Sequence, residues 1–398
     1  MRNVVKVRIY PTTEQQVALS KAFGCARWWN YALNLNNETY KATGKGLSRQ
    51  GYNDRLPALK KEFPWLAQCY SQVLQSVSLN LSQAFINFFE GRAQYPNFKS
   101  KHGKQSIQYP QHVKLLDKAI KLPKIGDVKA KFHRVFDGKL KTVTVSMSRT
   151  GKYSASLLFD DGLPKPEISS QGKAVGIDLG LAHFAITSDG SKFDNPKPLK
   201  KREKNLKRKQ QKLSRKQKGS KRRAKARRIV ARVHERIANT RKDFQHKLSR
   251  KLVNENQVIV VEDLSVKNMV KNHNLAKAIS DCGWSEFTRQ LKYKAEKDGK
   301  TYLEIGRFFP SSKTCHVCLN QIDSLPLDVR SWECPNCKTQ HDRDVSAAIN
   351  IRDEGLRILS LGTSDTAQGG NVRPKRGRKS SVEAVAVELG SPVPLWAG

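Results

Sequence analysis

The sequence predicts a multidomain α+β protein, and three observations lead to this fold class. The chain has 398 residues, which corresponds to two or three domains at about 150 residues each. Its hydrophobic pattern changes along the chain, from alternating to helical, back to alternating, and then to apolar strands separated by helices. Two closely spaced pairs of cysteines near the C-terminal end predict a small metal-binding module.

The charge of the chain restricts its partners. Lys and Arg total 74 against 35 Asp and Glu, which gives a formal net charge of +39. Because much of this charge lies in particular segments, we expect a nucleic acid partner and an affinity that falls steeply with salt. The alternative is a generally basic protein without a specific ligand. No apolar run reaches the roughly 18 residues of a membrane-spanning helix, which excludes an integral membrane protein built from such helices.

The cysteine count and the first residues predict a cytoplasmic protein. Seven cysteines are an odd number, and no signal-peptide core precedes them. Both features favour a reducing compartment. We expect neither a membrane partner nor an obligate protein partner.

A strand is expected to open the chain, with a helical module after it. Residues 5–9 alternate between apolar and basic side chains, as in a strand with one buried face. Thr13-Glu14-Gln15-Gln16 fits a capping box, so a helix is expected to begin there and to continue through apolar residues from Leu19 to Leu33. Apolar residues from Leu74 to Phe88 also recur at helical spacing, and Gln75 lies on the polar face of that helix.

The next segment returns to strand periodicity. Alternating residues at 143–147 and 153–159 flank the turn Arg149-Thr150-Gly151-Lys152, which predicts a hairpin. Together with the first strand, this stretch can form one small barrel into which the helical module is inserted. The expected boundaries are 1–11 and 100–165 for the barrel and 12–99 for the helical module.

An α/β domain is predicted in the second half of the chain. Apolar runs at 174–177 and 258–261 are typical of strands buried on both faces. The remaining elements are a strand over 183–187, a helix over 284–296, a strand over 302–305 and a last short helix near Asp344. We expect this domain to cover 171–306 and 341–360.

A dense basic segment over 200–252 interrupts that domain. From Lys200 to Arg228 there are 17 Lys or Arg against one Glu, and Gly219-Ser220 is expected to break the segment into a helical hairpin. Because like charges one turn apart repel each other, these helices should need phosphate for stability. The expected nucleic-acid contacts in the hairpin are Lys207, Arg208, Lys209, Lys212, Arg222 and Arg223.

Three carboxylates are candidates for a catalytic metal centre. Asp178 and Glu262 each follow an apolar strand, at the sheet edge where ligands collect in open α/β folds, and a third lies in His341-Asp342-Arg343-Asp344. Three clustered carboxylates need a compensating cation, and a pair of Mg²⁺ ions would serve to hydrolyse a phosphodiester. Two alternatives remain at this point: solvated strand ends, and the phosphate loop of sugar kinases and actin-like ATPases, which resembles Gly176-Ile177-Asp178-Leu179-Gly180.

The cysteine module, expected over 307–340, predicts a structural zinc site. Two Cys-x-x-Cys pairs are separated by 15 residues, a zinc-ribbon spacing, and the ligands are Cys315, Cys318, Cys334 and Cys337. Four thiolates close the coordination shell, so the zinc is not expected to perform hydrolysis. His316 and His341 remain possible ligands by residue type, and free thiols are the alternative.

Taken together, these residues resemble the TnpB family of transposon-encoded RNA-guided DNA endonucleases, which are related to the type V CRISPR effectors. The resemblance covers roughly residues 1–375. The matching motifs are Val-Arg-Ile-Tyr-Pro at 7–11, Gly-Ile-Asp-Leu-Gly at 176–180, Val-Glu-Asp-Leu at 261–264, Pro-Ser-Ser-Lys-Thr-Cys at 310–315, His-Asp-Arg-Asp at 341–344 and Gly-Gly-Asn-Val-Arg-Pro at 369–374.

The resemblance implies a fold and a function. The fold is an RNase H-like (RuvC) nuclease domain with an inserted zinc ribbon, preceded by a wedge barrel that holds a helical recognition module. The function is cleavage of double-stranded DNA, guided by an RNA from the transposon end, next to a short flanking motif that the face around Gln75 would read. The expected cofactors are two catalytic Mg²⁺ ions and one Zn²⁺ ion, and the expected partners are the guide RNA and the target DNA. The resemblance also implies a bacterial or archaeal protein that is associated with the nucleoid through DNA.

The family's catalytic residues map onto Asp178, Glu262 and Asp344, which would also bind magnesium. Asp344 is preferred to Asp342 because the family pattern Asp-x-Asn-Ala-Ala begins at Asp344. Ser346 replaces the usual Asn of that pattern, a change expected to affect a neighbouring contact and the level of activity.

Two other function classes stay open. One is a nuclease-dead relative that represses genes by binding RNA and DNA, and the intact carboxylate set argues against it. The other is a transposase that joins DNA ends without RNA. Residues 361–398, which are rich in Gly, Ser and Pro and carry a basic cluster, are expected to be disordered.

Overall fold

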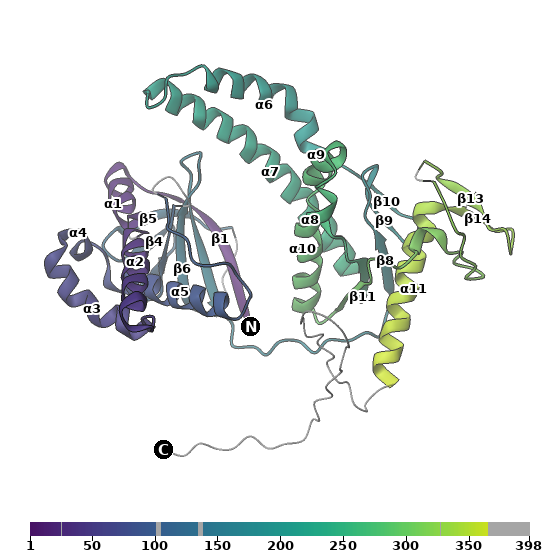
Figure 1. Ribbon diagram of the computed structural model, residues 1–398, viewed down its shortest axis with the longest axis horizontal. Helices are drawn as coiled ribbons and strands as arrows, with labels where there is room; N and C mark the ends of the chain where they lie inside the picture. Colours follow the sequence, from purple (N-terminus) through teal and green to yellow (C-terminus); the bar gives the residue numbers. More distant parts are fainter. Residues whose placement is uncertain (25, 101–104, 134–137, 327, 365–398) are drawn as a thin grey trace, which may run out of the picture. The chain divides into compact units, whose positions relative to one another are not determined.

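A computed structural model describes residues 1–24, 26–100, 105–133, 138–326 and 328–364. The chain divides into two compact units. The first unit comprises residues 1–165 and 207–235, and the second comprises residues 166–206 and 236–398. Figure 1 shows the helices and strands of both units.

The first unit is built on a seven-stranded antiparallel sheet. The strands are β1 (Arg2–Tyr10), β2 (Gln105–Tyr109), β3 (Lys114–Leu116), β4 (Ala119–Leu122), β5 (Gly126–Lys131), β6 (Lys139–Met147) and β7 (Tyr153–Asp160), in the order β2-β6-β7-β1-β5-β4-β3. The predicted pairing of the first strand with the later hairpin is therefore confirmed. Among the described residues, no pairing joins the end strands β2 and β3, so closure into a barrel stays a prediction.

Five helices follow β1 and pack with this sheet in one core. They are α1 (Thr13–Phe23), α2 (Ala26–Thr43), α3 (Arg49–Glu62), α4 (Pro64–Ala67) and α5 (Ser71–Phe89). The core contains strand residues such as Val145 and Leu157 and helix residues such as Leu19 and Leu74. The fully buried Trp28 donates its indole N–H to Ser78 of α5, which satisfies two polar groups inside the helical module.

The predicted start of the first helix was wrong by one residue. Thr12, not Thr13, is the N-cap: its hydroxyl accepts the N–H of Gln15, and its own N–H donates to the Gln15 side chain. Both capping-box partners thus lie one position earlier, because Thr12 keeps the extended backbone that follows β1. The single helix expected through Leu33 is also divided in two, since α1 ends at Gly24.

The second unit has a five-stranded sheet in the order β10-β9-β8-β11-β12. The strands are β8 (Ala174–Asp178), β9 (His183–Thr187), β10 (Lys192–Asp194), β11 (Val258–Glu262) and β12 (Thr301–Ile305). The strands β8, β11 and β12 are parallel, whereas β9 and β10 are antiparallel to their neighbours. Four of these strands match the sequence prediction, and β10 was not predicted.

Helices cover both faces of this sheet, which explains the continuous apolar strands. On one face, Ile259 and Val261 pack with Phe287 of α10 (Trp284–Lys297). On the other face, Val258 and Val260 pack with Ile351 of α11 (Arg343–Ser364). Alternate residues of one strand thus enter two different cores. Two helices before α10 were not predicted: α8 (Val266–Met269) and α9 (His273–Cys282).

Two glycines allow α11 to lie directly against the sheet. A Cβ on Gly176 of β8 would come within 2.0 Å of the carbonyl oxygen of Ala348, and a Cβ on Gly355 would come within 2.5 Å of the Val260 side chain. Neither position can hold a larger residue without moving the helix. This close packing fixes how far the start of α11 lies from the end of β8.

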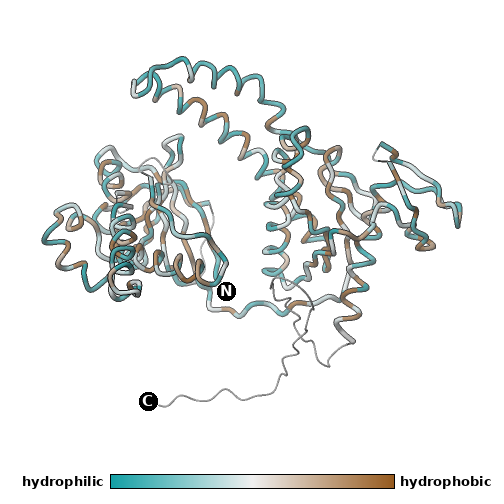
Figure 2. Tube along the Cα trace, viewed as in Figure 1, coloured by the Kyte–Doolittle hydropathy of each residue, from teal (hydrophilic) through white to brown (hydrophobic). Residues whose placement is uncertain are grey.

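The predicted basic hairpin is confirmed as α6 (Pro198–Ser214) and α7 (Lys221–Glu255). Gly219 in the connecting turn has φ of +87°, which favours glycine. Near the turn, Arg223 donates to the carbonyl oxygens of Leu213 and Lys216 and so ties the two helices together. Figure 2 shows α6 as mainly hydrophilic along its length.

The C-terminal part of the described chain contains the cysteine module and α11. The module has a short 3₁₀ helix η1 (Ser311–Lys313) and the strand pair β13 (Ser331–Glu333) and β14 (Gln340–Asp342). α11 is longer than the short helix predicted and includes residues 361–364, which were expected to be disordered. The rest of the predicted tail, 365–398, lies outside the described residues. None of the helices in the described ranges is long and apolar enough to cross a bilayer.

Candidate active site

Asp178 and Glu262 lie side by side at one edge of the second sheet. They are the last residues of β8 and β11, which are adjacent parallel strands. Ile177 is directly opposite Val261 in the pairing register, so the next residue on each strand is the carboxylate. Parallel strands bring their carboxyl ends to the same edge, and the two side chains therefore meet there.

Asp344 joins this pair from α11. It occupies the first turn of the helix, one turn before Ala348, the residue whose carbonyl oxygen touches Gly176 of β8. Gly176 is two residues before Asp178. The close contact between α11 and β8 therefore sets Asp344 near Asp178, although the two residues are 166 positions apart in the sequence.

The negative charges of Glu262 and Asp344 act on Asp178. The pKa of Asp178 is raised to about 7, first by burial and then by the negative charges of Glu262 and Asp344. Burial also raises the pKa of Glu262, against the opposing effect of a hydrogen bond from Ser311. The site therefore holds more negative charge than its surroundings compensate, which suits a divalent cation.

The neighbouring Asp342 has different partners. Its Oδ1 accepts the backbone N–H groups of Asp344 and Val345 at 3.1 Å, so it caps the start of α11. Its Oδ2 lies 2.5 Å from Nζ of Lys192. These bonds occupy Asp342 in a structural role, whereas Asp344 acts on the electrostatics of Asp178.

Asp344 is paired with an arginine that the sequence prediction did not include. Nη1 of Arg330, in the cysteine module, lies 3.1 Å from Oδ1 and 3.4 Å from Oδ2 of Asp344. This guanidinium compensates one of the three carboxylates. Among the described residues, no three carboxylates have their oxygen atoms as close together as the sulfur atoms of Cys315, Cys318, Cys334 and Cys337.

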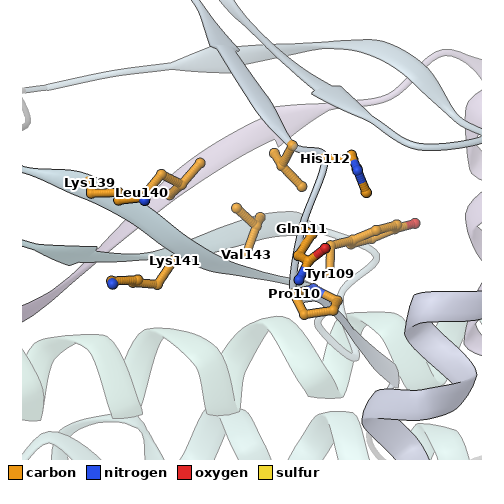
Figure 3. A pocket seen from close by; sticks show the side chains of 9 residues that line it. Tyr109, Pro110, Gln111, His112, Lys139, Leu140, Lys141 and Val143 are labelled. Atoms are coloured by element: carbon orange, nitrogen blue, oxygen red, sulfur yellow. The ribbon is translucent and has the colours of Figure 1, made fainter.

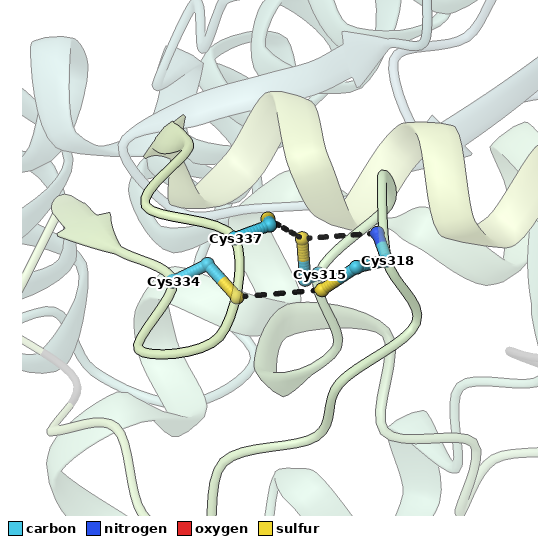
Figure 4. A group of neighbouring side chains, drawn as sticks. All are labelled: Cys315, Cys318, Cys334 and Cys337. Atoms are coloured by element: carbon cyan, nitrogen blue, oxygen red, sulfur yellow. Dashed lines mark hydrogen bonds between the residues drawn. The ribbon is translucent and has the colours of Figure 1, made fainter.

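The four predicted cysteines form one compact cluster (Figure 4). Their sulfur atoms all lie within 4.8 Å of one another, and two of the contacts, Cys315 to Cys337 and Cys318 to Cys334, are 3.5 Å. Four thiolates around a zinc ion, with Zn–S bonds of about 2.3 Å, stand about 3.8 Å apart. The cluster therefore fits a tetrahedral zinc ion with little rearrangement.

The two histidines of this region lie beside the cluster. Nε2 of His341 is 3.1 Å from Sγ of Cys315, and the His341 ring packs against Trp332. Nδ1 of His316 is 3.1 Å from Oγ of Ser346, the residue that departs from the family pattern. His341 is thus a hydrogen-bond partner of a thiol, an arrangement typical of residues around a metal site.

The predicted nucleic-acid contacts lie in the first unit. Gln75 is half-buried on α5, and the next residue, Ser76, is buried. In the basic hairpin, four of the six predicted residues are exposed, and the other two are half-buried: Lys207, Arg208, Lys212 and Arg222, then Lys209 and Arg223. Their positions are compatible with phosphate contacts.

A pocket of the first unit lies away from these residues. A pocket of about 470 Å³ opens at the end of β2 and along β6, where Lys139, Lys141 and the ring of Tyr109 line it (Figure 3). None of the predicted site residues lines this pocket. It is therefore separate from every site that the sequence indicated.

Sequence reasoning missed Ser311 and Arg330, which contact Glu262 and Asp344. Ser311 lies in the motif Pro310-Ser311-Ser312-Lys313-Thr314-Cys315, which signalled the family but suggested no role for its serines. Arg330 lies in no recognisable motif. No local pattern could have linked either residue to a carboxylate, because the contacts join distant parts of the chain.

Comparisons with protein families match three parts of the chain. A family model described as "Probable transposase" matches residues 154–273. A model described as "Cas12f1-like, TNB domain" matches residues 284–351, which include the cysteine cluster, Arg330 and Asp344. A model described as "Helix-turn-helix domain" matches residues 1–45.

Similar proteins extend over nearly the whole chain. A Streptomyces pristinaespiralis protein named "Putative RNA-guided DNA endonuclease" is 40% identical over 94% of this chain and 93% of its own. An Escherichia coli K12 protein named "Putative RNA-guided DNA endonuclease InsQ" is 32% identical over 90% of this chain and 93% of its own. A mimivirus "TnpB-like protein" is 25% identical over 88% of this chain and 73% of its own.

A solved structure shares the fold. The Cas12f1 protein, determined by cryo-EM in a complex with a single guide RNA and target DNA, superimposes with a TM-score of 0.56. The match covers 88% of this chain and 98% of that chain at 13% sequence identity. At this identity the likeness establishes a shared mixed α/β multidomain architecture.

Proposed function

Because this chain belongs to the TnpB family, we propose that it is an RNA-guided endonuclease that cuts double-stranded DNA by metal-dependent hydrolysis. The observation that supports the proposal is that Asp178 and Glu262 end adjacent parallel strands, while Asp344 is close enough to raise the pKa of Asp178. The guide would be an RNA from the transposon end, and the target would be marked by a short flanking motif. The net charge of +39 suits a protein that holds two polyanions.

The three carboxylates are proposed to hold two Mg²⁺ ions. Bound there, these ions would supply an activated water for attack on the phosphodiester and would stabilise the leaving 3′ oxygen. Asp178 contributes from β8, the middle strand of the sheet, where burial first and then the charges of Glu262 and Asp344 raise its pKa. Arg330 is paired with Asp344, so Asp344 would exchange part of this ion pair for the metal if it binds one.

The cysteine cluster is proposed to hold one structural zinc ion, with no part in hydrolysis. All four ligand positions are filled by thiols, which leaves no open position for water. The module would form a zinc ribbon over 307–340 that shapes the surroundings of Asp344 through Arg330.

The other segments are assigned roles as part of the same proposal. Residues 1–11 and 100–165 would form the wedge barrel, and residues 12–99 would form the recognition module that reads the flanking motif through Gln75. Residues 171–306 and 341–360 would form the RuvC-like domain, with the hairpin at 200–252 gripping RNA phosphates. The exposed Lys207, Arg208, Lys212 and Arg222 support this last role.

The test is DNA cleavage by single-residue variants loaded with guide RNA. Asp178→Ala, Glu262→Ala and Asp344→Ala should each reduce cleavage by at least about a thousandfold. Binding of RNA and target DNA should persist, because these residues contact metal rather than the nucleic-acid backbone. Asp342→Ala is the matched control and should keep most of the activity. If Asp342→Ala is inactive and Asp344→Ala cuts normally, the third ligand has been assigned incorrectly.

The same assay separates the two other function classes. A nuclease-dead repressor would bind its RNA-directed target without cutting it, with or without the carboxylates. A transposase would join DNA ends in a sample treated with RNase. RNA-dependent cutting that disappears in the three alanine variants supports the proposal and excludes both.

A further inference from the structure

The cysteine module contacts the carboxylate centre through a serine. Oγ of Ser311 donates a hydrogen bond of 2.5 Å to Oε1 of Glu262. Ser311 begins the 3₁₀ helix η1, four residues before the first cysteine of the cluster. The serine is 7% exposed, so water has little access to compete for this bond.

Ser311 is itself held in place by a residue of α11. The side-chain amide of Asn350 donates to the carbonyl oxygens of Ser311 and Thr314, each at 2.7 Å. Asn350 is only 4% exposed. Its two N–H bonds therefore hold the first and last residues of the segment from Ser311 to Thr314, which directly precedes Cys315. The helix that makes these bonds is the one that carries Asp344.

This arrangement determines the orientation of Glu262. A free glutamate side chain can rotate about three bonds, and each metal-binding event would have to restrict that motion. The hydrogen bond from Ser311 to Oε1 restricts the rotation of the Glu262 carboxylate, and Oε2 is the oxygen that could bind a cation. Groups that orient a metal ligand in this way typically contribute about 10- to 100-fold to metal affinity or activity.

We infer that Ser311, clamped by Asn350, is a positioning residue that presents Glu262 to the catalytic cations, so that zinc binding at Cys315 favours cation binding at the carboxylates. This inference rests on the proposed function, since it requires the carboxylates to hold cations. The alternative is that the Ser311 bond only satisfies two buried polar groups. In that case, its loss would lower stability and leave cation affinity unchanged.

The experiment titrates Mn²⁺ into the full chain, with zinc bound and without nucleic acid, and measures free Mn²⁺ by electron paramagnetic resonance. Ser311→Ala should weaken Mn²⁺ binding about tenfold. Ser311→Thr keeps a hydroxyl and should restore most of the affinity. Ser312→Ala removes the hydroxyl of the next residue in the same helix and should match the unsubstituted protein. A Ser311→Ala affinity within twofold of the unsubstituted value would overturn the inference.

Asn350→Ala and zinc depletion test the second half of the inference. Both should weaken Mn²⁺ binding in the same direction as Ser311→Ala. If zinc-depleted protein, still folded by circular dichroism, binds Mn²⁺ as tightly as before, the link between the two centres is refuted. If Asn350→Ala does not fold, the Ser311 variants and zinc depletion still decide the question.

Asp178→Ala distinguishes failure of this inference from failure of the proposed function. If it binds Mn²⁺ like the unsubstituted protein, the carboxylates do not hold the cation and the proposed function fails. If it loses the site while Ser311→Ala keeps it, the proposed function stands and only the role of Ser311 is rejected.

Discussion

Asp178 is a buried carboxyl group with two other carboxylates near it. Its pKa is raised to about 7 by burial and by two neighbouring carboxylates, against about 3.9 in an unfolded chain. A carboxyl group with a raised folded-state pKa makes the fold less stable as pH rises from the unfolded value through the folded one. The metal-free protein should therefore lose stability between about pH 4 and pH 7 through this residue.

Asp178→Asn should reveal this effect. In buffer without Mg²⁺, we expect the variant to exceed the unsubstituted protein in free energy of unfolding by about 1 kcal/mol or more at pH 8, and to match it near pH 4. Urea unfolding at both pH values is the measurement. A difference that does not change with pH would contradict the argument.

Asp342→Asn is the control, because its effect on the free energy of unfolding at pH 8 should have the opposite sign. Burial raises the pKa of Asp342, but the hydrogen bonds from Lys192 and two backbone N–H groups prevail and lower it. A carboxyl with a lowered pKa stabilises the fold above its unfolded pKa, and that contribution disappears as pH falls through the folded value. Asp342→Asn should therefore be less stable than the unsubstituted protein at pH 8.

At the scale of elements, the carboxylate centre depends on how α11 docks on β8. Gly176→Ala would push a methyl group into the Ala348 carbonyl, 2.0 Å away. We expect a loss of about 1 to 3 kcal/mol of stability and a strong loss of cleavage, since Asp344 would move with the helix. Thermal unfolding and cleavage rate are the measurements. Gly306→Ala, whose Cβ would meet no atom within 4 Å, is the control and should change neither.

The cysteine module should depend on its metal. Elemental analysis of freshly purified protein should find one zinc per chain, and the Cys315→Ser, Cys334→Ser double variant should lose it. Because residues 307–340 have a small core made mainly of the cysteines, Trp332 and a few partly buried neighbours, this segment should then become sensitive to limited proteolysis. Zinc-free preparations with a protease-resistant module would refute the assignment.

At the scale of the whole molecule, the proposed function divides target specificity between the protein and its guide RNA. Bidentate contacts from a few side chains, such as Gln75, discriminate by about 1–3 kcal/mol each. The rest of the target specificity is assigned to base pairing with the guide, while basic residues bind phosphates regardless of sequence.

Neutralising part of the hairpin should test this division. Replacing Lys207, Arg208, Lys209 and Lys212 by Gln should weaken RNA binding and reduce the slope of log affinity against log salt by about three to four. The flanking motif should stay the same. Gln75→Ala should do the reverse, altering motif preference at unchanged RNA affinity. Filter binding across a salt series and cleavage of a randomised flanking library are the measurements. An unchanged salt slope in the hairpin variant would refute the role of the hairpin.

The sequence alone determined the features that depend on local pattern. The buried strands ending at Asp178 and Glu262, the basic helical hairpin and the four cysteines all follow from periodicity, charge and spacing over short stretches. The residue at which a helix begins does not follow from residue type alone. Thr12 and Thr13 are equally good N-caps by residue type, and the extended backbone after β1 selects Thr12.

The tertiary structure decided which distant residues meet. Asp344 reaches Asp178 because Gly176 lets α11 approach the sheet, Ser311 reaches Glu262 because Asn350 holds its backbone, and Arg330 reaches Asp344 from the cysteine module. The physical reason is that such contacts depend on packing distances between elements far apart in the chain. A local pattern fixes a residue's conformation and burial, but only the packed fold fixes its neighbours.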